Sequence, residues 1–107
     1  MRILNTQELM IQVKTTCCPN PGMGTWTFLI KSSGFVKNGI VEKTTSNRIV
    51  LHGIHQALLY LEENETFDKD ITITTCNMYA INVILKRWKA HKNLDLLYPI
   101  WDLMDEI

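Results

Sequence analysis

The chain is short of three things that would narrow its function: paired cysteines, an excess of one charge and a long apolar run. Its three cysteines, Cys17, Cys18 and Cys76, are odd in number and include an adjacent pair, so they make a poor disulfide framework. They form no Cys-x-x-Cys motif, which speaks against a structural zinc site, and reduced thiols fit a cytoplasmic protein better.

The charges of the chain cancel, because eleven basic residues face eleven acidic ones among 107 residues. A dedicated duplex-binding protein usually carries a basic excess, since phosphate contacts supply much of its affinity. Any nucleic-acid binding must therefore come from a local patch. No charged start precedes a long apolar run, so we expect no signal peptide, no membrane span and a cytoplasmic location.

The patterning predicts a single domain over residues 1–107 with the element order β-β-β-α-β-α-α. After a lead-in at 1–8, strands at 9–17, 26–31 and 35–43 are expected to form an antiparallel meander, with a bulge or bend at Asn38-Gly39. Thr45 or Ser46 can cap the first helix. The buried face of this helix is predicted to hold Val50, Ile54, Ala57, Leu58 and Leu61.

The second half of the chain begins with a polar connection at 63–70 and a short apolar strand at 71–75, which we expect to run parallel to a neighbour. Asn77 can cap a second helix, in which the apolar spacing extends to Trp88. A last helix is expected from Asp95 or Pro99 to Ile107, with Pro99 in its first turn. The apolar side of this last helix holds Leu96, Ile100, Leu103, Met104 and Ile107.

Three motifs, taken in order, resemble those of the ribonuclease H family. The segment 13–16 stands where the family has Thr-Asp-Gly-Ser, and Asn20-Pro21-Gly22 matches the loop that follows. The segment 44–50 (TTSNRIV) matches a helix start with a glutamate two residues after its arginine, and 75–79 (TCNMY) matches Thr-Asp-Ser followed by tyrosine. The resemblance implies an α/β fold with a mixed sheet: an antiparallel meander, a parallel fourth strand, helices packed on the sheet and a truncated C-terminus.

The resemblance also implies hydrolysis of the RNA strand of a hybrid by two magnesium ions, but the acids are missing. The matching positions hold Lys14, Val50 and Cys76: a cation, a group that cannot ligate and a ligand too soft for magnesium. The family's fourth acid lies beyond a fifth strand, for which we expect no counterpart. We therefore predict a pseudoenzyme, not an enzyme, with no catalytic residue, cofactor or metal site. His52 and His55 lack a third metal ligand.

The residues that match nucleic-acid contacts of the family each have a second interpretation. Lys14 could bind a phosphate or could be a solvated lysine at a strand end. Asn20, Asn47 and Arg48 match positions that touch a hybrid, but Asn20 also suits a turn and Asn47 a helix start. Asn77 matches a family position near a DNA phosphate, and a role as a helix cap explains it at least as well. The basic run at 86–92 contributes Lys86, Arg87 and Lys89, which also suit a solvated helix end, and its Trp88 suits the core better than a stacking platform.

The leading hypothesis is therefore a phage or bacterial accessory protein of nucleic-acid metabolism that binds an RNA–DNA hybrid or another duplex weakly and in a salt-dependent way. The alternative is a protein-interaction or assembly module with no nucleic-acid function, which zero net charge favours. A third hypothesis, a new enzyme that uses Cys76 or Lys14, is weaker because the sequence shows no nucleophile–base pair. The strand at 71–75 is expected to be an apolar sheet edge, which favours a homodimer through this strand or the last helix, without membrane contact.

Overall fold

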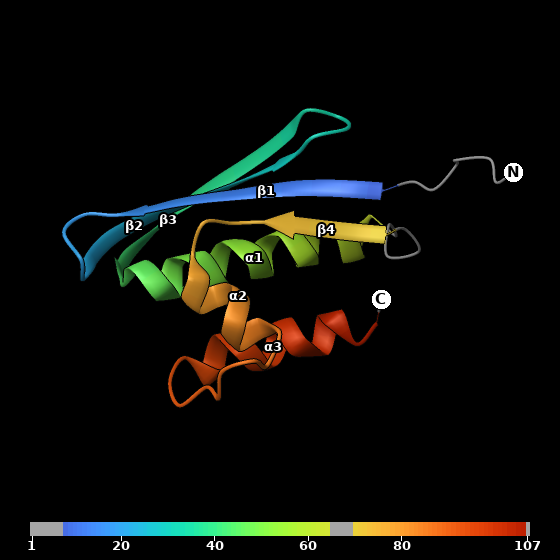
Figure 1. Cartoon of the computed structure of the whole chain (residues 1–107). Coiled ribbons are helices and arrows are strands. Elements are labelled where there is room, and N and C mark those ends of the chain that lie inside the picture. The colour runs from blue at the N-terminus through green and yellow to red at the C-terminus, as the bar shows by residue number, and fades with distance from the viewer. Residues whose placement is uncertain (1–7, 65–69, 107) are drawn as a thin grey trace, which may run out of the picture.

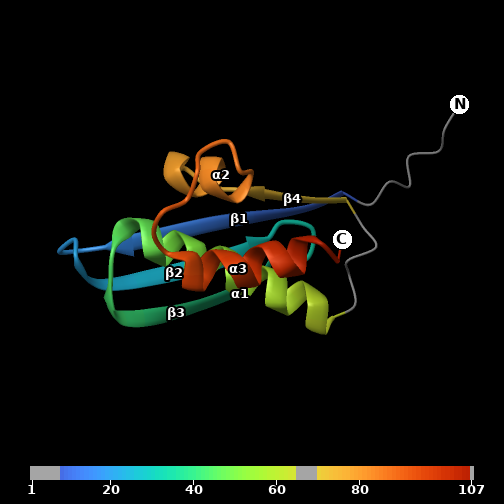
Figure 2. The same cartoon turned by 90° about the horizontal axis from the view of Figure 1, so that it is seen from below.

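The computed structural model describes residues 8–64 and 70–106, in which four strands form one mixed sheet and three helices lie to one side of it (Figures 1 and 2). The strands are β1 (Glu8–Cys17), β2 (Gly22–Ile30), β3 (Phe35–Thr44) and β4 (Asp70–Thr74). They lie in the order β3-β2-β1-β4, with β1–β2 and β2–β3 antiparallel and β1–β4 parallel. The predicted meander, parallel fourth strand and element order are confirmed.

The strands alternate between a helix-facing side and an open side, as their sequences predict. Trp26, Phe28 and Ile30 are buried on β2, whereas Thr25 and Thr27, which alternate with them, are only half-buried. Because side chains of a strand point to opposite faces in turn, one face of the sheet is apolar and the other carries hydroxyls. The apolar face receives the first helix.

The helices are α1 (Ser46–Glu63), α2 (Met78–Ile84) and α3 (Leu94–Met104). The side chain of Thr45 accepts a hydrogen bond from the Arg48 amide, and that of Asn77 accepts one from the Ala80 amide, so both predicted caps are present. The helix α1 lies against the sheet, and α3 packs on the side of α1 away from the sheet (Figure 1). Every residue of the predicted apolar face of α1 is buried.

The sequence was wrong about three local features. Pairing between β2 and β3 continues unbroken through Thr27↔Asn38 and Trp26↔Gly39, and the irregularity lies instead near Gly22 and Gly24. A Cβ on Gly39 would lie 2.6 Å from the Trp26 ring, so this glycine serves a close cross-strand contact and not a bulge.

The second and third helices also differ from their predicted bounds. The helix α2 ends at Ile84, because Lys86 adopts φ 61° and the Arg87 and Trp88 amides both donate to the Asn82 carbonyl. Trp88 is consequently exposed and not part of the core. Pro99 lies inside α3 and not in its first turn, since the helix begins at Leu94.

Parts of three predictions lie outside the described residues: most of the lead-in at 1–8, most of the connection at 63–70, and Ile107. Within the described residues, no helix is both long and apolar enough to span a membrane.

The contact of α1 with the sheet depends on Gly53, which lies one turn after Val50. A Cβ at this position would lie 3.1 Å from Val13 Cγ1 and 3.2 Å from Trp26 Cβ, tighter than ordinary packing allows. The absent side chain therefore lets the helix backbone approach β1 and β2 closely.

We predict that Gly53→Val lowers the free energy of unfolding by about 1–3 kcal/mol, because an overpacked core must shift. The control Glu63→Val, on the exposed end of the same helix, should change it by only a few tenths of a kcal/mol. Urea unfolding followed by circular dichroism measures both. Equal effects of the two variants would show that Gly53 is not a close contact.

Candidate nucleic-acid interface

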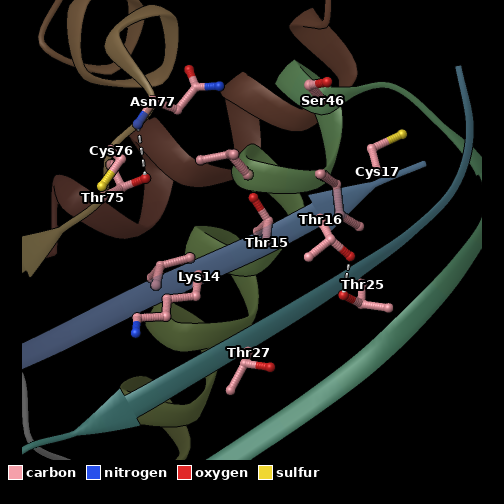
Figure 3. Close-up of a pocket in the computed structure, with 13 residues that line it drawn as sticks. Lys14, Thr15, Thr16, Cys17, Thr25, Thr27, Ser46, Thr75, Cys76 and Asn77 are labelled. Carbon is pink, nitrogen blue, oxygen red and sulfur yellow. Dashed lines mark hydrogen bonds between the residues drawn. The ribbon is translucent and has the colours of Figure 1, made fainter. Parts of the chain in front are cut away.

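A pocket opens where β1 and β4 diverge. The two strands pair as far as Gln12 and Thr74, and the residues beyond these positions line a cavity of about 560 Å³ (Figure 3). We call this cavity the strand-end pocket. Its lining comes from β1, β2, the start of α1 and the turn after β4, and comprises Val13, Lys14, Thr15, Thr16, Cys17, Thr25, Thr27, Ser46, Ile49, Val50, Thr75, Cys76 and Asn77.

The three positions that match the family's acids meet in this pocket. Lys14 comes from β1, Val50 from the first turns of α1 and Cys76 from the turn after β4. Val50 is buried, whereas Lys14 and Cys76 are exposed. Lys14 lies on the open face of the sheet, because it pairs with Thr27 across the strands, while Val50 belongs to the helix side. The three positions, far apart in the sequence, thus lie at one place in the fold.

The donor atoms of the strand-end pocket do not fit magnesium. The lining offers ammonium, hydroxyl, thiol and amide groups but no carboxylate, and magnesium requires hard, usually anionic oxygen ligands. Among residues 8–64 and 70–106, no three His, Cys, Asp or Glu side chains are grouped so that they could hold a metal ion. His52 and His55 are on α1 outside the pocket, and burial, with some repulsion from His52, lowers the pKa of His55.

Sequence reasoning missed the hydroxyl groups of the pocket. Six lining residues carry one, and the hydroxyls of Thr16 and Thr25 lie 2.6 Å apart (Figure 3). Threonine is common in strands because it is β-branched, so its presence there did not predict a binding role. The strand register collects these residues, because it places Thr27 opposite Lys14 and Thr25 opposite Thr16.

Three predicted contact residues connect the elements around the pocket. The Asn20 side-chain oxygen accepts a hydrogen bond from the Ser46 amide (3.1 Å), which joins the β1–β2 loop to the start of α1. The Asn77 side-chain amide donates to the Asn47 side-chain oxygen (3.2 Å), which joins the starts of α2 and α1. Asn77 therefore acts as a cap and also lines the pocket, whereas Asn20 and Asn47 stand beside it.

Arg48 makes the one ion pair found within the described residues, with Asp95 at the start of α3. Its two terminal nitrogens lie 3.0 and 2.7 Å from the two carboxylate oxygens of Asp95, and one of them also donates to the Asn93 side-chain oxygen (3.0 Å). The hydrogen bond with Asp95 raises the pKa of Arg48, and the same bond lowers the pKa of Asp95. The Arg48 charge is thus largely matched within the fold.

The remaining predicted residues lie elsewhere. Lys86, Arg87 and Lys89 line a separate hollow of about 530 Å³ together with Trp88. The predicted contact residues are therefore divided between the strand-end pocket, its supporting network and this second surface.

Comparison with known proteins finds relatives of this chain by sequence. No protein-family model matches the chain. It is 33% identical over 91 residues to the ribonuclease H of Caldicellulosiruptor saccharolyticus, covering 81% of this chain and 60% of that protein. It is 28% identical over 96 residues to the ribonuclease HI of Campylobacter jejuni, covering 84% of this chain and 66% of the relative.

Solved structures agree on the fold. An RNase H1 named LC11, in complex with an RNA/DNA hybrid, superposes with a TM-score of 0.82 at 14% identity, covering 92% of this chain and 77% of that one. The N-terminal RNase H domain of a Mycobacterium tuberculosis protein gives a TM-score of 0.81 at 13% identity, covering 94% and 76%. These sequence relatives support a ribonuclease H-like family for the chain, and its fold is that of the RNase H domains. This ribonuclease H-like chain spans less than two thirds of the length of the two curated relatives, 60% and 66%.

One prediction from the sequence is contradicted by these relatives. We expected no enzyme, but the similar proteins are named as ribonucleases H, so the relatives point to an enzyme family. The reason for the error is that three substituted positions bear on one metal mechanism, whereas the similarity to ribonucleases H extends over more than four fifths of the chain.

We predict that Asp95→Asn lowers stability at neutral pH by up to about 1 kcal/mol, the upper range for an exposed ion pair. The pKa of Asp95 is depressed in the folded state, so its contribution is present above the unfolded value of about 3.9 and is lost as the pH falls through the folded value. The difference between wild type and Asp95→Asn should therefore shrink as the pH falls below the unfolded value and vanish once the pH lies below the folded value. Asp102→Asn, an exposed aspartate of α3, serves as the control, and urea unfolding at several pH values decides.

Proposed function

We propose that this ribonuclease H-like domain binds a nucleic-acid duplex, with an RNA–DNA hybrid as the first candidate, and seats a backbone phosphate in the strand-end pocket. The carrying observation is the chemistry of the lining: one lysine, six hydroxyl groups and an amide, without a carboxylate. Phosphate oxygens accept hydrogen bonds and attract cations, so this donor set suits them.

The charge of Lys14 supports this proposal. In the part of the chain that the structure describes, the Lys14 ammonium makes no hydrogen bond or ion pair, whereas the charge of Arg48 is matched by Asp95. A cation beside hydroxyl donors is the arrangement that gains most from a phosphate when, as among the described residues here, no other group competes for its charge. Arg48 then acts by holding α1 and α3 beside the pocket.

The hybrid is the first ligand to test because a structural neighbour of this fold was solved in complex with an RNA/DNA hybrid. The chain would serve as an accessory protein of nucleic-acid metabolism. The zero net charge predicts modest affinity that local groups supply.

Hydrolysis of the hybrid is to be measured in the same experiments as binding, because the relatives are named as ribonucleases. The strand-end pocket supplies no magnesium ligand set, so we assign no hydrolytic step to its residues.

We predict that Lys14→Glu weakens hybrid binding by about tenfold at low salt and reduces the dependence of log affinity on log salt by about one unit, the effect of losing one phosphate contact. Lys37→Glu is the matched control, because it makes the same charge change at an exposed position on β3. Fluorescence anisotropy with labelled hybrid, double-stranded RNA and double-stranded DNA measures all three proteins.

Two outcomes would count against duplex binding at this pocket. One is the absence of binding to any duplex at low salt, which would favour the interaction-module alternative. The other is an equal loss in Lys14→Glu and Lys37→Glu, which would indicate general charge attraction and no seat for a phosphate.

A second proposal, a homodimer, is supported by the edge of the sheet. Among the described strands β4 is an edge, as predicted, and an apolar hollow of about 230 Å³ lies beside it. Ile71 and Ile73 of β4 line this hollow together with residues of α1, α2 and the end of α3. If two copies of β4 pair antiparallel about Thr72, Ile71 of each copy lies opposite Ile73 of the other, so the edge is complementary to itself.

We predict a dimer in light scattering at micromolar concentration, and Ile71→Lys should shift it to a monomer because a buried ammonium in the interface is costly. Ile40→Lys, on the exposed β3 edge, should leave the dimer intact. A monomer for the wild type, or dissociation by both substitutions, would refute pairing through β4.

A further inference from the structure

The turn after α2 builds an exposed aromatic surface that the strand-end pocket does not use. Trp88, Tyr98 and Trp101 line one hollow of about 530 Å³, and Trp88 and Tyr98 are 51% and 57% exposed. We call it the aromatic hollow. Large aromatic side chains are usually covered in a monomer, so two half-exposed rings around one cavity need a reason.

The rings are held in place by the fold. The Trp101 indole nitrogen donates to the Ile84 carbonyl at 2.9 Å, which fixes α3 to the end of α2. Tyr98 meets Trp101 edge-on with the ring centroids 5.8 Å apart. Trp88 lies in a turn whose amides bond to the Asn82 carbonyl. The hollow is therefore largely formed before any ligand arrives, which reduces the entropy lost on binding.

The rim of the aromatic hollow is cationic. The Lys86 ammonium lies 5.0 Å from the Trp101 ring centroid, and Arg87 and Lys89 also line the hollow. No acidic residue occurs from Ile71 to Leu94, although the whole chain has no net charge. Within the described residues Arg87 and Lys89 form no ion pair, so their charges remain open to a ligand.

We propose that the aromatic hollow is a binding site for single-stranded nucleic acid, in which an unpaired base stacks on the exposed rings and the flanking phosphates meet Lys86, Arg87 and Lys89. Aromatic faces beside cations are how proteins hold single strands without reading sequence. The charge favours this ligand over a proline-rich peptide, which also binds aromatic grooves but has no phosphates. The site extends the proposed function to a strand that leaves a duplex, and it does not require the strand-end pocket.

The probe is a short single-stranded DNA carrying 2-aminopurine, whose fluorescence falls when it stacks. Titration with the full chain at low salt should quench the probe. Tyr98→Ala should weaken binding by about tenfold, the order expected for one stacked base, and Tyr98→Phe should retain it because the ring remains. Lys89→Glu should weaken binding and reduce its salt dependence. Unfolding midpoints confirm that these surface variants fold.

Reciprocal controls separate the two sites. Lys14→Glu should leave single-strand binding nearly unchanged, and Tyr98→Ala should leave binding to a blunt duplex nearly unchanged. Binding of the single strand without binding of any duplex would refute the proposed function and support the aromatic hollow.

Three results would overturn the inference: no quenching at low salt, equal affinities of wild type and Tyr98→Ala, or binding of a proline-rich peptide in place of the oligonucleotide. Duplex binding that survives any of these results would leave the strand-end pocket proposal standing.

Discussion

The close approach of α1 to the sheet at Gly53 is the constraint on which the other features depend. With no side chain at this position, the helix backbone lies against Val13 and Trp26. This close packing places the start of α1 beside the end of β1. Ile49 and Val50, one turn earlier, then reach the strand-end pocket. A larger residue would push the helix outward and would separate the strand ends from the helix side of the pocket.

A network of polar side chains also holds the neighbouring elements against α1. Asn20 joins the β1–β2 loop to α1, Asn77 joins α2 to α1, and Arg48 joins α3 to α1. Each bond satisfies a donor or a charge near a helix start, where amides lack partners within the helix. The motif residues Asn20, Arg48 and Asn77 beside the pocket thus have a structural role, because each joins two elements of the fold.

The sequence predicted the parts of the fold that depend on local periodicity and caps. The face of α1 from Val50 to Leu61, the Thr45 cap and the parallel placement of 71–75 all follow from spacing that neighbours reinforce. It failed where distant contacts decide. The end of α2 depends on Lys86 in a left-handed conformation, and no propensity of lysine predicts that. The hydroxyl lining of the pocket depends on strand register, which residue types alone do not give.

The early end of α2 matters most for function, because it changes the role of one residue. The sequence predicted Trp88 for the core, because it continues the helical spacing of Ile81 and Leu85. Instead the chain reverses at Lys86, and Trp88 joins Tyr98 and Trp101 on the surface. An exposed indole lacks the stabilisation that burial of its apolar surface would give. The fold nevertheless leaves Trp88 exposed, although the neighbouring Trp101 is anchored to the Ile84 carbonyl. The same reversal brings Lys86, Arg87 and Lys89 beside the rings, so the aromatic and cationic groups share one cause, the turn that ends the helix.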